Sequence, residues 1–191
     1  MRLSTVLLIV LVIAGIAAPL GYLYHRRRER QRTIEENELS AQKNLRSLIA
    51  AEEIFRSGDA DRNGILDYWT GDVAELHRYQ LIPAPLADAD AAPLRPTSTM
   101  PVPASGYYFI ALDSLEPSGE LYRQDTDGKS GKVHHRSRFG FCAFPARYGE
   151  TGRYSWIMTQ DGNRIVAIDA GGKPLRRYPD DYDRDPFPMP K

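Results

Sequence analysis

The sequence predicts an α+β protein in which one long N-terminal helix packs on a small antiparallel β-sheet. The helix prediction rests on residues 33–57, which contain no proline or glycine and carry apolar residues seven positions apart, at Ile34, Ala41, Leu48 and Phe55. The sheet prediction rests on aromatic and β-branched runs in the second half of the chain. With 191 residues, the chain has room for one modest domain. Because its 25 basic side chains are balanced by 25 acidic ones, it has no net positive field that would attract nucleic acid.

Within the helix of residues 33–57, the apolar stripe continues through Leu45, Leu48, Ile49 and Phe55. The same spacing places Glu52 and Glu53 on the polar faces of the helix. One face of this helix is therefore expected to lie against the sheet, and the other faces to meet water.

After Gly58 ends the helix, oxygen-bearing side chains follow at alternate positions, the spacing of a calcium-binding loop with Gly64 at its sharp turn. Calcium takes about six to eight oxygen ligands. Position twelve of this loop is Thr70 instead of the usual bidentate Glu, so a further carboxylate must complete the site and the affinity is modest. The alternative is a helix cap followed by an ordinary Asn-Gly turn. The predicted ligands, in a loop over residues 59–72, are Asp59, Asp61, Asn63, the carbonyl of Ile65, Asp67 and Asp72.

The N-terminus is predicted to anchor the chain in a membrane. Val6–Leu20 is almost wholly apolar and, with residues 21–24, reaches the roughly 20 residues that a spanning helix needs. A cleaved signal peptide with Gly15 and Ala17 before the cut is the alternative, but Pro19 and the continuing apolar run fit it poorly. Residues 1–32 are therefore assigned to a single-pass anchor with a basic flank.

The basic flank, His25–Arg32, leaves the orientation in the membrane open. The positive-inside rule places this cluster and the domain in the cytoplasm. A calcium loop of modest affinity fits the outside, where calcium is abundant. We favour an inner-membrane anchor with the domain in the periplasm or outside the cell. In either orientation the cluster suits anionic lipid headgroups.

The remaining chain completes a single domain over residues 33–175. Asp72–Tyr79 predicts a short helix, and the proline-rich Pro83–Pro103 predicts an extended surface loop in which Asp88 and Asp90 are solvated. Strands are predicted over residues 106–113, 139–145, 154–159 and 164–169, the last two joined by a hairpin turn at Asp161-Gly162. The tail, residues 176–191, is too polar and proline-rich to form a core and is disordered or lies on a partner.

Candidate catalytic residues are few. His134 and His135 are adjacent on a predicted polar turn, and with Cys142 they lack the usual spacing of a zinc site. A solvated turn is the better prediction for the histidines, and a buried core position for Cys142, which lies in an apolar run. The sequence contains no phosphate-binding glycine loop and no nucleophile elbow.

The order of the motifs resembles a known group of bacterial proteins. An AEExFR helix at Ala51–Arg56, the DxDxNGxxDYWTGD loop that follows it, Gly106–Phe109, Phe141–Ala146 and Gln160–Gly162 are similar to pilin-like proteins related to the DUF2950 family and to the major pseudopilins of type II secretion. The resemblance implies a helix packed on a sheet of three or four strands, with calcium in the loop of some relatives. A prepilin cleavage site, with its Glu five residues into the mature helix, is missing from residues 2–14.

These features predict a non-catalytic structural or accessory subunit, either a pseudopilin-like component or a peripheral subunit of a larger membrane complex. Its expected contacts are other membrane-protein subunits, through the N-terminal helix and the C-terminal tail, and membrane lipid, with no nucleic acid. The alternative is a periplasmic enzyme, or a lipid- or ligand-binding module, whose site is not visible in the sequence.

Overall fold

The computed structural model describes residues 3–95, 100–115, 118–160 and 164–178, with side chains from Gly21 onward except that of Leu115. Helix α1 (Leu3–Ser57) leads through β1 (Tyr68–Trp69) to two short helices, α2 (Ala74–Arg78) and α3 (Ala84–Ala87). The strands that follow are β2 (Tyr107–Ala111), β3 (Ser114–Leu115), β4 (His134–His135), β5 (Gly140–Pro145), β6 (Ser155–Thr159), β7 (Ile165–Ile168) and β8 (Arg177–Tyr178). A long helix with antiparallel sheet confirms the predicted α+β class.

The main sheet has the order β2-β5-β6-β7, and every neighbouring pair is antiparallel. Its register aligns Phe109 with Ala143, Ala143 with Trp156 and Trp156 with Ala167 across the sheet. These strands correspond to the four predicted ones, and β6 and β7 pair as the predicted hairpin requires. The predicted turn at Asp161-Gly162 lies outside the described residues.

Alternation along the strands divides the interior into two clusters, because successive strand side chains point to opposite faces. Phe109, Phe141 and Ala143 lie in the main core with α1, whereas Ile110, Cys142 and Ile157 belong to a smaller core on the other face. Cys142 is fully buried, and its burial raises the pKa of the thiol to about 12. The prediction of a buried core position for Cys142 is confirmed.

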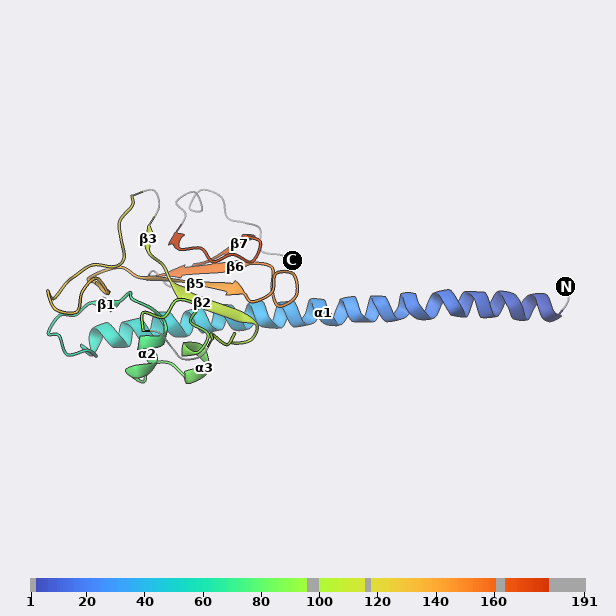
Figure 1. The fold of residues 1–191 in the computed structure, drawn as a ribbon, viewed down its shortest axis with the longest axis horizontal. Helices are drawn as coiled ribbons and strands as arrows, with labels where there is room; N and C mark the ends of the chain where they lie inside the picture. The colour runs from blue at the N-terminus through green and yellow to red at the C-terminus, as the bar shows by residue number, and fades with distance from the viewer. Residues whose placement is uncertain (1–2, 96–99, 116–117, 161–163, 179–191) are drawn as a thin grey trace.

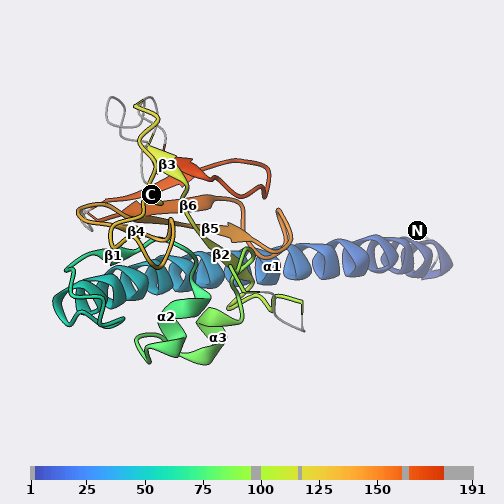
Figure 2. The ribbon, with the colours of Figure 1, turned by 60° about the vertical axis from the view of Figure 1, so that its left-hand side comes forward.

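Helix α1 runs along one face of the main sheet. The short helices α2 and α3 lie on the side of α1 that faces away from the sheet, as both views show (Figures 1 and 2). Leu45, Leu48 and Phe55 are buried where the predicted stripe meets the sheet. Each such side chain contributes about 1.5–3 kcal/mol when it is fully buried. The part of α1 before the domain projects beyond it as a rod (Figure 1).

The projecting part of α1 contains the predicted anchor. Among the residues whose side chains are described, no helix has both the length and the apolar character of a membrane span. The predicted anchor at Val6–Leu20 falls on residues whose helical backbone is described and whose side chains are not.

Two small sheets flank the main one. β1 pairs with β4 antiparallel, and β3 pairs with β8 in parallel, with Ser114 opposite Arg177. The N–H of Asp113 also donates to the carbonyl of Arg176 at 2.6 Å. The fold thus includes residues up to Tyr178, beyond the predicted domain end at residue 175, because backbone pairing with β3 holds this polar segment. Residues 179–191 of the predicted tail lie outside the described residues.

The prediction of an extended, solvated loop over Pro83–Pro103 is wrong in two respects. Pro83 initiates the short helix α3, and Asp90 is 2 % exposed instead of solvated. The Asp90 carboxylate accepts hydrogen bonds from the backbone N–H groups of Val73 at 2.7 Å, Ala74 at 2.9 Å and Ala92 at 2.8 Å. This buried carboxylate therefore ties the beginning of α2 to the proline-rich segment.

Gly152 is required by a close approach between the β5–β6 connection and β2. A Cβ at this position would lie 2.0 Å from Oη and 2.5 Å from Cζ of the fully buried Tyr107. Gly152→Ala is therefore expected to lower the free energy of unfolding by about 1–3 kcal/mol in urea denaturation. Because Tyr107→Phe removes the closest atom, the alanine should cost less in that background, and strictly additive effects would contradict the proposed clash.

Candidate cation site

The loop after α1 folds around its own side chains. Asp59 accepts a hydrogen bond from the N–H of Gly64 at 3.1 Å, Asp61 accepts one from Asn63 at 3.3 Å, and the amide oxygen of Asn63 accepts one from Ile65 at 2.6 Å. Gly64 has a φ of 82°, which glycine adopts without steric cost. These short-range bonds wind the backbone into a tight loop in which the polar side chains turn toward its interior.

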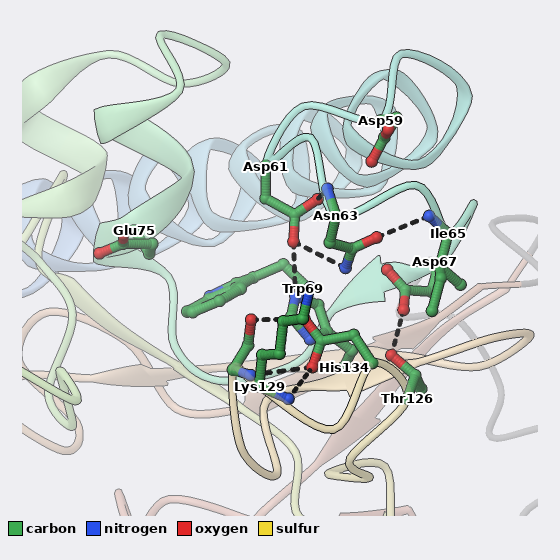
Figure 3. A network of polar contacts seen from close by, with 12 residues as sticks. Asp59, Asp61, Asn63, Ile65, Asp67, Trp69, Glu75, Thr126, Lys129 and His134 are labelled. Carbon is green, nitrogen blue, oxygen red and sulfur yellow. Dashed lines mark hydrogen bonds and ion pairs between the residues drawn. The ribbon is translucent and has the colours of Figure 1, made fainter.

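The predicted ligands do not all come together. Asp61, Asn63 and Asp67 lie beside one another, and Asp59 at the end of the helix has its carboxylate near that of Asp61 (Figure 3). Asp72 is the predicted ligand that lies outside this group. The predicted carbonyl ligand, that of Ile65, accepts a hydrogen bond from the N–H of Asp67 at 3.0 Å.

Asp67 is the most deeply buried carboxylate of the loop. Its side chain is 1 % exposed, and one carboxylate oxygen accepts a hydrogen bond from the hydroxyl of Thr126. The other oxygen, Oδ1, is buried and has no hydrogen-bond partner among the described residues. Buried polar atoms are nearly always paired, so this unpaired carboxylate oxygen makes Asp67 a candidate cation ligand.

Glu52 adds a second buried carboxylate from α1. Its Oε2 accepts a hydrogen bond from the N–H of Trp69 at 2.9 Å, and its Oε1 has no partner among the described residues. Burial raises the pKa of Glu52 well above its usual value, and the nearby charges of Glu53 and Asp67 raise it further. The prediction that Glu52 lies on a polar helix face is therefore wrong, since the residue is fully buried.

His134 closes the site on the side of β4. It is fully buried, and its Nε2 lies 3.1 Å from Oδ2 of Asp61. Its ring lies edge-on to Trp69 at 5.4 Å and stacks on Phe55 at 6.3 Å. Burial is the main cause that raises the pKa of Asp61, while the charge of His134 acts in the opposite direction. The predicted solvated turn at the histidines is wrong, because β4 pairs with β1 and carries both rings inward.

The two histidines and Cys142 do not form a shared site. The Nε2 of His135 pairs with Glu120 at 3.3 Å, and its Nδ1 accepts a hydrogen bond from the N–H of Arg138 at 2.9 Å. Cys142 belongs to the smaller core on the far face of the sheet. In the part of the chain that the structure describes, no cluster of three or more His, Cys, Asp or Glu side chains has a metal-binding arrangement.

Asp72 is engaged elsewhere. One carboxylate oxygen accepts a hydrogen bond from the N–H of Glu75 at 3.0 Å, and the other accepts one from Leu94 at 2.6 Å. The indole N–H of Trp69 also lies 3.2 Å from this carboxylate. Asp72 thus holds the beginning of α2, and both of its carboxylate oxygens are occupied by backbone N–H groups and not directed at the loop ligands. Glu75 is engaged as well, since its carboxylate pairs with Arg78 at 3.3 Å.

A groove of about 480 Å³ lies between α2, α3 and the proline-rich segment. Its charged side chains are largely engaged with one another, since Glu75 pairs with both Arg78 and Arg95. The Nδ1 of His77 lies 2.8 Å from the carbonyl of Ile82. These contacts stabilise the α2–α3 region of the fold.

Glu52, Thr126 and His134 are the site residues that sequence reasoning missed. Only Glu52 carried a signal, because it lies four residues after Leu48 and three before Phe55, on the buried stripe itself.

Comparisons with protein-family models, with curated proteins and with solved structures found no match to this chain.

Proposed function

We propose that the protein is a non-catalytic, single-pass membrane subunit whose pilin-like domain is stabilised by calcium and docks on a larger membrane complex. The observation that carries the proposal is the continuity of α1, which runs from Leu3 to Ser57 without a break. At 1.5 Å per residue this helix is roughly 80 Å long. Its first part carries the apolar sequence, and its last part supplies the core of the domain.

The arrangement of the domain supports a pilin-like role. A long N-terminal helix packed on one antiparallel sheet holds the domain at a fixed distance from the predicted anchor (Figure 1). The described polar clusters also favour binding over catalysis, because their side chains are tied into caps and ion pairs. We propose that further contacts with partner subunits come from the projecting helix and from the tail after Tyr178.

The anchor is tested by substituting its apolar stretch. In the full chain, Leu11→Arg combined with Ile13→Arg is expected to release the protein from the membrane fraction after carbonate washing, because each arginine costs about 2.5–3.5 kcal/mol at the centre of a spanning helix. Leu11→Val is the matched control and should stay with the membrane. Retention of the double-arginine variant would contradict the anchor. Protease added to intact cells should cleave the wild-type domain if it lies outside the cytoplasmic membrane.

For the cation, we propose Asp61, Asn63, Asp67 and the carbonyl of Ile65 as the central ligands, with the Thr126 hydroxyl beside them. Calcium fits this set because it prefers carboxylate, amide and carbonyl oxygens and tolerates irregular geometry. The buried Oδ1 of Asp67 has no hydrogen-bond partner among the described residues, and a bound calcium ion would pair with this oxygen.

Calcium is expected to raise the melting temperature of the full chain in detergent, since a ligand at 100 times its Kd stabilises the folded state by about 2.7 kcal/mol. Asp67→Asn and Asp61→Asn should each remove most of that rise. Asp169→Asn is the matched control, because Asp169 is exposed after β7 and its carboxylate accepts a hydrogen bond from the hydroxyl of Tyr148. No rise in the wild type, or an unchanged rise in Asp61→Asn, would identify the loop as a plain turn.

A further inference from the structure

A groove lined by arginines lies where the domain meets the projecting part of α1. It has a volume of about 770 Å³ and is lined by Arg26, Arg27 and Arg30 from α1 and by Arg147 from the β5–β6 connection. Its two acidic lining residues are Glu29 and Glu150. Four guanidinium groups therefore face two carboxylates, and the groove carries an excess of positive charge.

The β5–β6 connection is fastened to α1 by direct hydrogen bonds. The amide of Asn37 donates to the carbonyl of Thr151 at 2.9 Å, and the N–H of Arg153 donates to Glu38 at 2.9 Å. Gly152 permits the close contact of the same connection with Tyr107. The N–H of Arg147 donates to the hydroxyl of Thr151 at 3.0 Å, so these contacts also hold the backbone of Arg147 beside the arginines of the helix.

Two of the arginines already converge on one anionic group. The carboxylate of Glu150 lies 3.7 Å from Arg30 and 3.2 Å from Arg147, through its two different oxygens. All three side chains are substantially exposed, with the arginines 54 % and 73 % and Glu150 49 % accessible, so their mutual attraction is weakened by water. An arriving phosphate group can replace this carboxylate, and guanidinium groups bind phosphate oxygens with matching geometry.

The residues that precede the groove place it at a membrane surface. Tyr22, Leu23 and Tyr24 are 66 %, 58 % and 69 % exposed, and aromatic residues of this kind collect at membrane–water interfaces. Arg27 lies roughly 9 Å along the helix from Gly21, at a rise of 1.5 Å per residue. If the apolar stretch spans the membrane, the groove opens at the level of the lipid headgroups, and arginine side chains can reach toward them.

We propose that this groove binds the headgroup phosphate of an anionic phospholipid and thereby fixes the angle between the domain and the membrane. The inference rests on the proposed membrane anchoring. It adds that the domain itself, through Arg147, completes a lipid site that the basic run of the helix begins.

The test uses the full chain reconstituted into vesicles of phosphatidylcholine with 30 % phosphatidylglycerol, by analogy with typical anionic surface densities. After flotation, the protein is extracted in mild detergent, and the phosphatidylglycerol that remains bound is quantified by mass spectrometry. Wild-type protein should retain this lipid above its share in the bulk membrane. Arg27→Glu and Arg147→Glu should each lower the enrichment roughly fivefold, whereas Arg136→Glu, on the β4–β5 connection, should leave it unchanged.

Retention at the bulk ratio by the wild type, or unchanged enrichment in Arg147→Glu, would overturn the lipid site while the protein still floats with the vesicles. Failure of the wild-type protein to float with these vesicles would overturn the anchoring and the lipid site together. The stability of each variant is measured by urea unfolding. A loss of lipid enrichment is assigned to the groove only in a variant that is as stable as the wild type.

Discussion

Phe55→Ala is expected to lower the free energy of unfolding by about 3–5 kcal/mol, the usual cost of removing a fully buried aromatic side chain. Phe55 is 1 % exposed at the end of α1, and its ring meets that of Tyr79 edge-on at 5.2 Å. Trp69 and His134 lie against it at 6.3 Å each. The single ring thus joins α1 to β1, to β4 and to the segment after α2, and its loss leaves a cavity where four parts of the fold meet.

Urea denaturation of the full chain in detergent, followed by tryptophan fluorescence, measures this cost. Ile54→Ala is the matched control, because the neighbouring Ile54 is 56 % exposed and should change the stability by less than about 1 kcal/mol. Equal costs for the two variants would show that the end of α1 does not form part of the core. Because His134 packs on Phe55, the alanine variant should also weaken the calcium-induced rise in melting temperature.

The outline of the fold could be predicted because its signals are local. The heptad spacing of α1 and the alternation of β2, β5, β6 and β7 are each set by a few consecutive residues whose burial follows the period of the element. The calcium-type loop was also a local signal, since its ligands lie within one turn of chain. Only part of this set converges in the structure, because Asp72 has a nearer use in capping α2.

The missed features depend on contacts between distant residues. His134 and His135 follow a polar turn and give no strand pattern, yet pairing with Tyr68 and Trp69 buries both rings. Arg177 forms a strand only because β3 is available beside it. Glu52 differs, since its distance in sequence from Leu48 and Phe55 puts it on the buried stripe, and its assignment to a polar face overlooked that spacing. A carboxylate at a core position of a helix is itself a signal that a partner must be found for it.

Asp90→Ala is expected to cost about 3 kcal/mol or more, because it removes the acceptor for the N–H groups of Val73, Ala74 and Ala92 at once. The two N–H groups at the beginning of α2 would then be left without the anion that holds them. Asp90→Asn is the informative companion, since it keeps the shape and one acceptor oxygen but has no charge. Urea denaturation at pH 7 should therefore rank wild type and Asp90→Asn above Asp90→Ala.

The pH dependence of these variants separates hydrogen bonding from charge. Burial raises the pKa of Asp90 to about 6, despite the backbone N–H groups that lower it, and the charge of Asp72 raises it further. Because the folded-state pKa lies above the unfolded value of about 3.9, the folded state binds the proton more tightly, and stability is lost as the pH rises between these values. Wild type should thus lose on the order of 3 kcal/mol relative to Asp90→Asn between pH 4 and pH 7. A constant difference between the two proteins over this range would contradict a raised pKa, and would leave the N–H contacts as the whole contribution of Asp90 to the fold.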